Sequence, residues 1–374
     1  MAATAQSALA EIPDKIARPY APSWVDRVTG WVRGLPLHYP VVYLIPVVVL
    51  FATTTAIKWA DGSYQAAYEA GNHVGLFKVG PFFFYPFHAI PELVAFYALA
   101  LIHYLDDVAK RALATYAPAM KTDEATYRDL EYRLTKMPAL PTFLASLAGA
   151  VFAALVLLAL GYLLPDFMSR LLLFTSPAAT AIESGVFILL WWIWAALIYH
   201  TVRQLRLVSH IYNLYTRIDL FNLDPLYAFS WLTARTGIGW VAATYAFILT
   251  APGLMENVIT LGIMVFNVLF AVVAFAWPLV GIHRKLEAAK SERIYAANQS
   301  FEALSTELRR RTDIGDFARM TEMKDGMEAV NHEREILEKV HTWPWQRETV
   351  GGLSTALFLP LIIWLITRLL ERVI

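Results

Sequence analysis

Two ionisable residues stand within a mainly apolar stretch of the sequence, where a charge is costly. His88 and Glu92 are four residues apart, so on a helix they would share one face. An ionisable pair inside a membrane is a functional hypothesis by default. It could relay protons or hold a cation. The alternative is a mutually satisfied pair close to the outer end of its helix.

Three acidic residues near the predicted outer ends of apolar stretches could attract cations. They are Asp166, Glu183 and Glu256. Rings of carboxylates at a pore mouth do so in cation channels. For Glu183 a simpler role is available, because a carboxylate near the start of a helix complements the helix dipole.

Other patterns that carry chemistry are not found. His103, Asp106 and Asp107 could bind a cation, but charged residues at a solvated interface are the simpler interpretation. No helix offers a second spaced set of His, Asp and Glu, and the chain has no cysteine. The metalloprotease, nucleophile-elbow, phosphate-loop and dinucleotide-binding motifs are absent. We therefore expect no enzyme, no metal and no cofactor.

The elements that must position these residues are apolar stretches long enough to span a bilayer. The chain of 374 residues is 57% hydrophobic and has no net charge, which gives no indication of nucleic-acid binding. A helix needs about 20 apolar residues to cross. The sequence predicts an all-α polytopic membrane protein with seven transmembrane helices. They lie at about residues 41–59, 82–103, 141–164, 176–200, 225–250, 256–280 and 351–366.

The distribution of positive charge predicts the orientation in the membrane. Most of the 31 Lys and Arg residues fall in four polar stretches, at residues 1–40, 104–140, 201–236 and 282–350. Because basic residues near a span stay on the cytoplasmic side, the N-terminus is predicted inside and the C-terminus outside the cytoplasmic or plasma membrane. Arg368 and Arg372, beyond the last span, run against this rule.

The basic stretches also contain predicted helices of their own. In the N-terminal part, residues 1–40, an amphipathic helix starts after Ser23 and lies in the interface. In the six-span domain, residues 41–281, spans 4, 5 and 6 continue beyond the membrane. Residues 282–350 predict a cytoplasmic helical hairpin, followed by span 7 in residues 351–374. Apolar residues at helical spacing would pack the hairpin or contact a partner: Leu304, Leu308, Met323, Met327 and Leu337.

This architecture resembles the insect odorant and gustatory receptor superfamily in topology over most of the chain. The resemblance implies a ligand-gated, cation-conducting homotetramer, with contacts in the cytoplasmic helices and the last helix lining the pore. On that analogy Leu357, Leu361 and Leu365 form a hydrophobic gate. The final-helix signature of the family, Thr-Tyr followed by apolar residues and Gln-Phe, is not present in residues 351–374, so no binding residue is carried over.

Two other functions stay open. The chain could be a sensory or accessory subunit that binds a partner through the 282–350 hairpin, whose face is rich in methionine. It could also be a proton- or cation-coupled transporter that uses His88 and Glu92 on a proline-broken helix. An odd number of spans and the absence of repeats argue against the common transporter folds. In every case the lipid bilayer is the expected partner.

Overall fold

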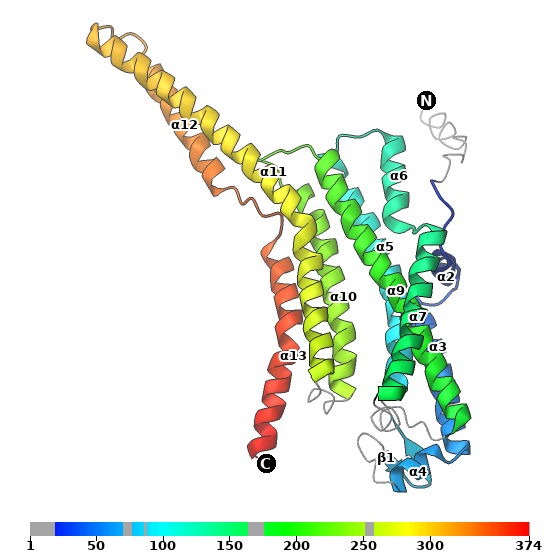
Figure 1. The fold of residues 1–374 in the computed structure, drawn as a ribbon. Coiled ribbons are helices and arrows are strands. Elements are labelled where there is room, and N and C mark those ends of the chain that lie inside the picture. Colours follow the sequence, from blue (N-terminus) through cyan, green and yellow to red (C-terminus); the bar gives the residue numbers. More distant parts are fainter. Residues whose placement is uncertain (1–18, 70–76, 86–87, 164–175, 251–257, 374) are drawn as a thin grey trace.

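The computed structural model describes residues 19–69, 77–85, 88–163, 176–250 and 258–373, and helices dominate it (Figure 1). Its elements in chain order are α2 (Trp24–Arg33), α3 (Tyr39–Ala60), α4 (Ser63–Glu69), β1 (Phe77–Val79), β2 (Phe82–Phe84), α5 (Ala89–Tyr116), η2 (Ala117–Ala119), α6 (Glu124–Thr135), α7 (Ala139–Leu163), α9 (Pro177–Leu214), η3 (Asp224–Tyr227), α10 (Ala228–Thr250), α11 (Val258–Asp313), α12 (Met320–Lys339) and α13 (Arg347–Val373).

Five of the described helices are long and apolar enough to cross a membrane. They are Tyr39–Ala60, Ala89–Ala119, Ala139–Leu163, Pro177–Leu214 and Val265–Asp313. Large apolar side chains on these helices are exposed, including Val48, Leu155 and Phe266. A surface of this kind suits contact with lipid rather than water. The prediction of an all-helical protein with membrane-type helices is therefore confirmed, while the count of seven spans and their orientation stay predictions.

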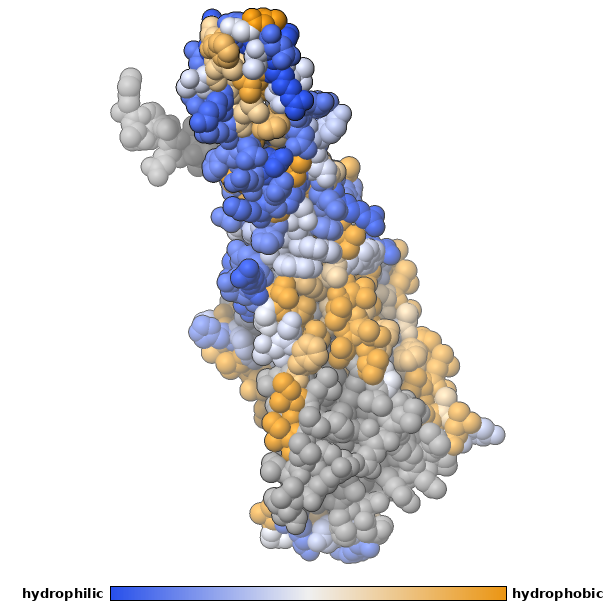
Figure 2. All heavy atoms as spheres, turned by 90° about the vertical axis from the view of Figure 1, so that its left-hand side faces the viewer, coloured by the Kyte–Doolittle hydropathy of each residue, from blue (hydrophilic) through white to orange (hydrophobic). Residues whose placement is uncertain are grey.

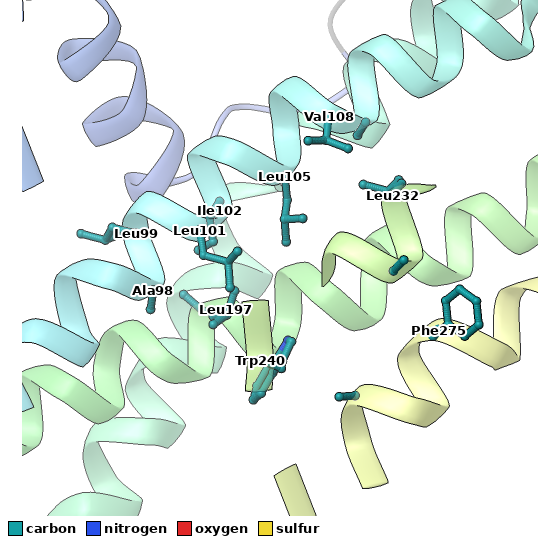
Figure 3. Packing of buried hydrophobic residues seen from close by; sticks show 14 of the residues in the cluster. Ala98, Leu99, Leu101, Ile102, Leu105, Val108, Leu197, Leu232, Trp240 and Phe275 are labelled. Atoms are coloured by element: carbon teal, nitrogen blue, oxygen red, sulfur yellow. The ribbon is translucent and has the colours of Figure 1, made fainter. Parts of the chain in front are cut away.

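The core lies around α5, which contacts α3, α6, α9 and α10. Figure 3 shows Leu101 of α5 directed toward Leu197 of α9 and Trp240 of α10, with Leu105 one turn further along α5. Trp240 is almost fully buried and donates its indole N–H to Thr201 Oγ1 at 3.2 Å. A buried indole normally needs such a partner, so this bond fixes how α9 and α10 face each other.

Two glycines allow neighbouring helices to approach closely. A Cβ at Gly149 of α7 would come within 2.3 Å of the Trp191 carbonyl oxygen on α9. A Cβ at Gly239 of α10 would come within 2.5 Å of a methyl carbon of Leu101 on α5. Small residues at helix contacts are typical of membrane bundles, because they let backbones pack without side chains between them.

The predicted second span begins in the wrong place. Residues 82–84 form strand β2, which pairs antiparallel with β1 through a turn at Gly80, where φ is +60°. Three consecutive phenylalanines favour a strand as readily as a helix when a glycine turn precedes them. Helix α5 starts only at Ala89 and runs to Tyr116. Pro91 therefore lies in the first turn, where a proline leaves no helical hydrogen bond unmade.

The predicted start of the fourth span agrees with the structure, whereas that of the fifth span does not. The Ser176 side chain accepts a hydrogen bond from Ala179 N at 3.0 Å, and Pro177 opens α9, as the sequence predicts. The extension of this helix beyond the apolar run is also confirmed, because α9 ends at Leu214. The fifth span is predicted to begin at residue 225. Residues 224–227 instead form the short 3-10 turn η3, and α10 begins after Tyr227.

A long helical hairpin projects from the bundle. Helix α11 has 56 residues and continues without interruption from the bundle into the hairpin, where α12 returns beside it (Figure 1). The reversal uses left-handed backbone at Gly315 and Arg319. We call the part formed by α11 beyond Ile282 and by α12 the projecting hairpin. Figure 2 shows hydrophilic residues over this hairpin and hydrophobic residues over the helices below it. Two helices side by side confirm the predicted helical hairpin, while its cytoplasmic position stays a prediction. The break in helical spacing at residues 312–316 coincides with the reversal.

The amphipathic helix α2 is attached to α7 through its N-cap. Ser23 and Asp26 form a capping box, and Asp26 Oδ2 also accepts the Met137 N–H at 3.0 Å. Trp24 donates its indole N–H to Ser146 of α7 at 3.1 Å. Trp31, on the other hand, is largely exposed. The predicted helix and its cap are confirmed, and the capping carboxylate also connects α2 to Met137, two residues before α7.

Candidate functional site

A buried cluster of ionisable side chains lies where α3, α4, α5 and α9 come together. Lys58 Nζ is 3.2 Å and His88 Nδ1 is 3.4 Å from the same oxygen, Oε1 of Glu183. The Tyr64 hydroxyl is 3.1 Å from His88 Nδ1. Glu92 lies four residues after His88, in the first turn of α5, and is equally buried. These residues, hereafter the Lys58 cluster, are each 4% exposed or less.

The ends of three helices bring the cluster together. Lys58 stands in the last turn of α3, and Gly62, with φ of +75°, reverses the chain so that Tyr64 of α4 returns beside it. His88 precedes α5 directly. Glu183 is in the second turn of α9, whose start is fixed by the Ser176 cap. The local turn and cap signals therefore determine where each side chain enters the bundle.

Asp61 ties the end of α3 to the start of α9 next to the cluster. Its side chain accepts hydrogen bonds from the Ser63 N–H at 2.9 Å and from the Ser176 hydroxyl. Partial burial by itself would raise the pKa of Asp61, but the hydrogen bonds from Ser176 and Ser63, with the charge of Lys58, bring it below its ordinary value of 3.8. The carboxylate is therefore charged in the folded protein at neutral pH.

The cluster contains one ammonium group, two carboxyl groups and one imidazole. Removing an ionised group from water is costly unless a charged or hydrogen-bonding partner accompanies it, so Lys58 and Glu183 depend on each other. His88 Nδ1 lies between a hydroxyl that can donate to it and a carboxylate that can accept from it. His88 Nε2 and Glu92 Oε2 are buried and have no hydrogen-bond partner among the residues that the structure describes. The cluster can thus take up a proton or a further hydrogen-bonding group.

The structure brings the two residues of the predicted intramembrane pair into one cluster. His88, however, contacts Tyr64 and Glu183, and no hydrogen bond or ion pair between His88 and Glu92 is found among the described residues. Glu183 was proposed as an outer cation-attracting residue, and it lies inside the protein against Lys58. The other two residues of that proposal, Asp166 and Glu256, lie outside the described residues.

Sequence reasoning left Lys58 and Tyr64 out of the site. A signal for Lys58 was available, since a lysine in an apolar stretch needs a buried anion or an exit to the interface. Tyr64 carried no signal, because it lies beyond the first predicted span, residues 41–59, in a segment without a motif.

The polar residues in the middle of α5 each contact a different partner. Asp106 Oδ1 is 2.9 Å from His200 Nε2, and both side chains are buried. Asp107 instead pairs with Arg33 of α2 at 2.8 Å. His103 Nδ1 lies 3.4 Å from the Tyr43 hydroxyl. Across the described ranges, no three His, Asp or Glu residues are grouped to hold a metal ion.

The residues predicted to form the gate lie on α13, at the edge of the bundle. Leu353 is buried and packs against Gly237 of α10, and Leu357 follows one turn later, half-buried on the same side. A second stripe, formed by Phe358, Ile362 and Ile366, is 58%, 51% and 51% exposed. The side chains of Leu361 and Leu365 lie outside the described residues.

The residues predicted to pack the hairpin lie on both of its helices. Leu337 is fully buried, whereas Leu304, Leu308, Met323 and Met327 are half-buried. The two helices of the hairpin therefore cover these side chains only in part.

Comparison with known proteins gives no relative. No family model, no curated protein and no solved structure matches this chain. The function must accordingly be argued from the residues and their geometry.

Proposed function

We propose that this chain is a multi-pass membrane protein that forms a homo-oligomeric, ligand-gated ion channel, with its projecting hairpin in the cytoplasm. The observation that carries the proposal is the direct connection between the hairpin and α13. Only residues 340–346 separate α12 from α13. If the hairpins of several copies associate, each copy must place α13 close to the same axis.

The surface of α13 supports an axial position. Its inner side packs on α10 through Leu353 and Leu357. Its exposed stripe, Phe358, Ile362 and Ile366, repeats every four residues and would face neighbouring copies. An apolar stripe of this kind can form a hydrophobic constriction, which closes a pore by excluding water. We therefore place the gate at this stripe and not at the residues facing α10.

The projecting hairpin supports assembly. Two helices alone cannot cover all of their apolar faces, and Leu304, Leu308, Met323 and Met327 remain half-buried. Association with the same faces of other copies would bury these side chains. The hairpin would then hold the oligomer together outside the membrane, as in the receptor superfamily that the topology resembles.

The Lys58 cluster supplies a site for the stimulus. It lies near the end of the bundle opposite to the projecting hairpin, beside α4 and the β1–β2 hairpin (Figure 1). Protonation or ligand binding there would change the balance of charge between α3, α5 and α9. Because α10 packs against α5 and α13 packs against α10, such a change has a continuous path to α13.

Cysteine cross-linking tests the proposal directly, because the natural chain contains no cysteine. Phe358→Cys should form disulfide-linked dimers in membranes under mild oxidation. The matched control is Val151→Cys, which is similarly exposed on α7, on a helix that the proposal leaves facing lipid. The purified wild-type protein should also give cation flux in liposomes. A monomer, or cross-linking that is equal at both positions, would contradict the proposal.

A second candidate is a proton-coupled transporter, which the proton-accepting geometry of His88 favours. In that case Glu92→Gln should abolish substrate-linked proton uptake, while the oligomeric state and the thermal stability remain as in the wild type. A channel, by contrast, should keep its single-channel conductance in Glu92→Gln and change only the stimulus needed to open it. Single-channel recording distinguishes the two.

A further inference from the structure

A polar pocket of about 450 Å³ lies between α2, α5 and α6, separate from the Lys58 cluster. Four cationic side chains line it: Arg33 from α2, Lys110 from α5, Arg128 from α6, and Lys136, which follows α6 directly. The elements that supply them are far apart in the sequence, so the pocket is formed only when the amphipathic helix docks on the bundle.

Each of the four cations has a carboxylate within 4 Å, and Lys136 is the one held least closely. Arg33 pairs with Asp107 at 2.8 Å, and Lys110 pairs with Glu131 at 2.9 Å. Lys136 Nζ lies 3.9 Å from Asp26 Oδ1, which is too long for a hydrogen bond. Its side chain is only 25% exposed, so the ammonium group is held near the pocket and not free in solvent.

Among the described residues, the carboxylates that line the pocket pair with Arg33 and Lys110 and not with Arg128 or Lys136. Asp107 and Glu131 each belong to one of the pairs described above, and Asp106 is buried against His200. Of the four cations, Lys136 has no carboxylate within hydrogen-bonding distance, and Arg128 pairs only with Glu124 of its own helix among the described residues. A ligand with one negative charge and several acceptor oxygens complements this arrangement.

The position of the pocket points to the membrane surface. Arg33 ends the amphipathic helix α2, on which Trp31 is exposed, and Leu37 and Val41 are exposed just beyond it at the start of α3. Exposed Trp and aliphatic residues next to basic ones are typical of the interface between hydrocarbon and headgroups. The cations of the pocket therefore lie at the depth of lipid phosphates.

We propose that this pocket binds a phosphate group, and that its source is a phospholipid headgroup. Arg33, Lys110, Arg128 and Lys136 would surround the phosphate oxygens, while the acyl chains would pass along the exposed apolar side of α2 and α3. The bound lipid would join α2, α5 and α6, because its phosphate contacts all three. This proposal is independent of the channel function and concerns a different end of the bundle.

The test uses the full-length protein in dodecyl maltoside micelles, with dioleoylphosphatidylglycerol as the probe and dioleoylglycerol, which lacks phosphate, as its control. Native mass spectrometry should show retention of the phospholipid only. Lys136→Gln and Arg128→Gln should each weaken retention about fivefold, since one basic residue near the surface contributes about that factor. Lys324→Gln, on an exposed part of α12, should change nothing.

Two further measurements make the outcome decisive. Lys136→Arg keeps the charge and should retain the lipid, which separates loss of binding from damage to the fold. Glycerol 3-phosphate and inorganic phosphate are added as competitors at millimolar concentration. Displacement of the lipid by either would support the phosphate site but make its source soluble. Equal retention of both lipids, or equal retention by wild type, Lys136→Gln and Arg128→Gln, would overturn the proposal.

Discussion

Lys58 Nζ lies 3.2 Å from Glu183 Oε1, and neither side chain reaches solvent. The pair joins the last turn of α3 to the second turn of α9. Its energetic role follows from the cost of burying each charge. Attraction between the two ions in a buried site offsets that cost only while both are present.

Removing one charge of this pair should lower the free energy of unfolding far more than replacing both charged residues by apolar ones. Lys58→Met leaves a carboxylate buried without its ammonium partner and should destabilise the protein by about 3–5 kcal/mol. Glu183→Leu should cost a similar amount. The double variant Lys58→Met/Glu183→Leu removes both charges and should recover most of the loss. Thermal unfolding in detergent, followed by fluorescence of the tryptophans, measures all four proteins.

The control for this cycle is the pair of Lys324 and Glu328 on the projecting hairpin. Its side chains are 72% and 69% exposed, and exposed pairs contribute little. Lys324→Met should therefore shift the unfolding temperature slightly or not at all. Additive losses in the Lys58 and Glu183 variants would show that the two charges do not stabilise each other.

Gly149 should tolerate no side chain, even a methyl group. An added Cβ would lie 2.3 Å from the Trp191 carbonyl oxygen and 2.6 Å from Ala195 Cβ, so α7 and α9 would have to separate. Gly149→Ala should therefore destabilise the protein and loosen this contact. Gly161→Ala is the matched control on the same helix, because no atom of the described residues lies within 4 Å of its added Cβ. It should be neutral or slightly stabilising, since alanine favours a helix over glycine.

The two Gly variants are compared by thermal unfolding and by limited proteolysis in the segment that joins α7 to α9. Equal stability of Gly149→Ala and Gly161→Ala would mean that α7 and α9 separate at little cost. In that case the close approach at Gly149 would have no role in holding the bundle together.

Much of the helical fold could be predicted because its signals are local. The Ser176–Pro177 start, the long α9 and the break near residues 312–316 all follow from caps and from continuous 3–4 spacing. The prediction of a helix at residues 82–84 was wrong, because the local signal there does not decide between helix and strand. A short apolar run has no periodicity that separates strand from helix, and only the pairing with β1 decides it.

The Lys58 cluster was predictable only in part, because its residues come from distant parts of the sequence and meet through tertiary packing. The spacing of His88 and Glu92 indicated a shared site, and both residues are in the cluster. The spacing could not indicate that Glu183 receives Lys58, since these residues come from helices far apart in the sequence. Similarly, helical periodicity placed Leu357 on a stripe of α13 but could not show which stripe faces α10.

Acidification should weaken the junction between α3 and α9 at Asp61. The pKa of Asp61 is lower in the folded protein than its ordinary value of 3.8, so its hydrogen bonds stabilise the fold above that pH. The stabilisation is lost as the pH falls below 3.8 and through the lower folded-state pKa. Unfolding temperatures measured between pH 7 and pH 2 should show this loss in the wild type.

Asp61→Asn should show a smaller fall in unfolding temperature over that range, because the group that titrates is gone. Ser176→Ala should also reduce the fall, since it removes a hydrogen bond that holds the pKa of Asp61 down. Asp325→Asn, which changes an exposed residue of α12, serves as the control and should follow the wild type. The same acid dependence in Asp61→Asn and wild type would exclude Asp61 as the source.

Stacked rings should determine how firmly the segment between α12 and α13 is held against α11. Trp343 lies parallel to His283 at 3.9 Å between ring centres, and it also stacks on Trp345 at 4.3 Å. Trp345 in turn stacks on Phe275 of α11. Each aromatic contact contributes about 0.5–1.5 kcal/mol, so Trp343→Ala, which removes two of them, should lower local stability by about 1–3 kcal/mol.

The loss at Trp343 should appear locally, as faster amide hydrogen exchange in residues 337–346, with the exchange of α5 unchanged. Lys290 would still hold the end of α12, because it donates to the carbonyl oxygens of Glu338 and Val340 at 2.7 and 2.9 Å. Trp31→Ala, at an exposed tryptophan of α2, controls for the loss of a large ring and should leave this segment unchanged. Because the segment leads directly into α13, a channel should also open with altered kinetics in Trp343→Ala. Unchanged exchange would mean that Lys290, and not the stack of rings, holds the segment between α12 and α13 against α11.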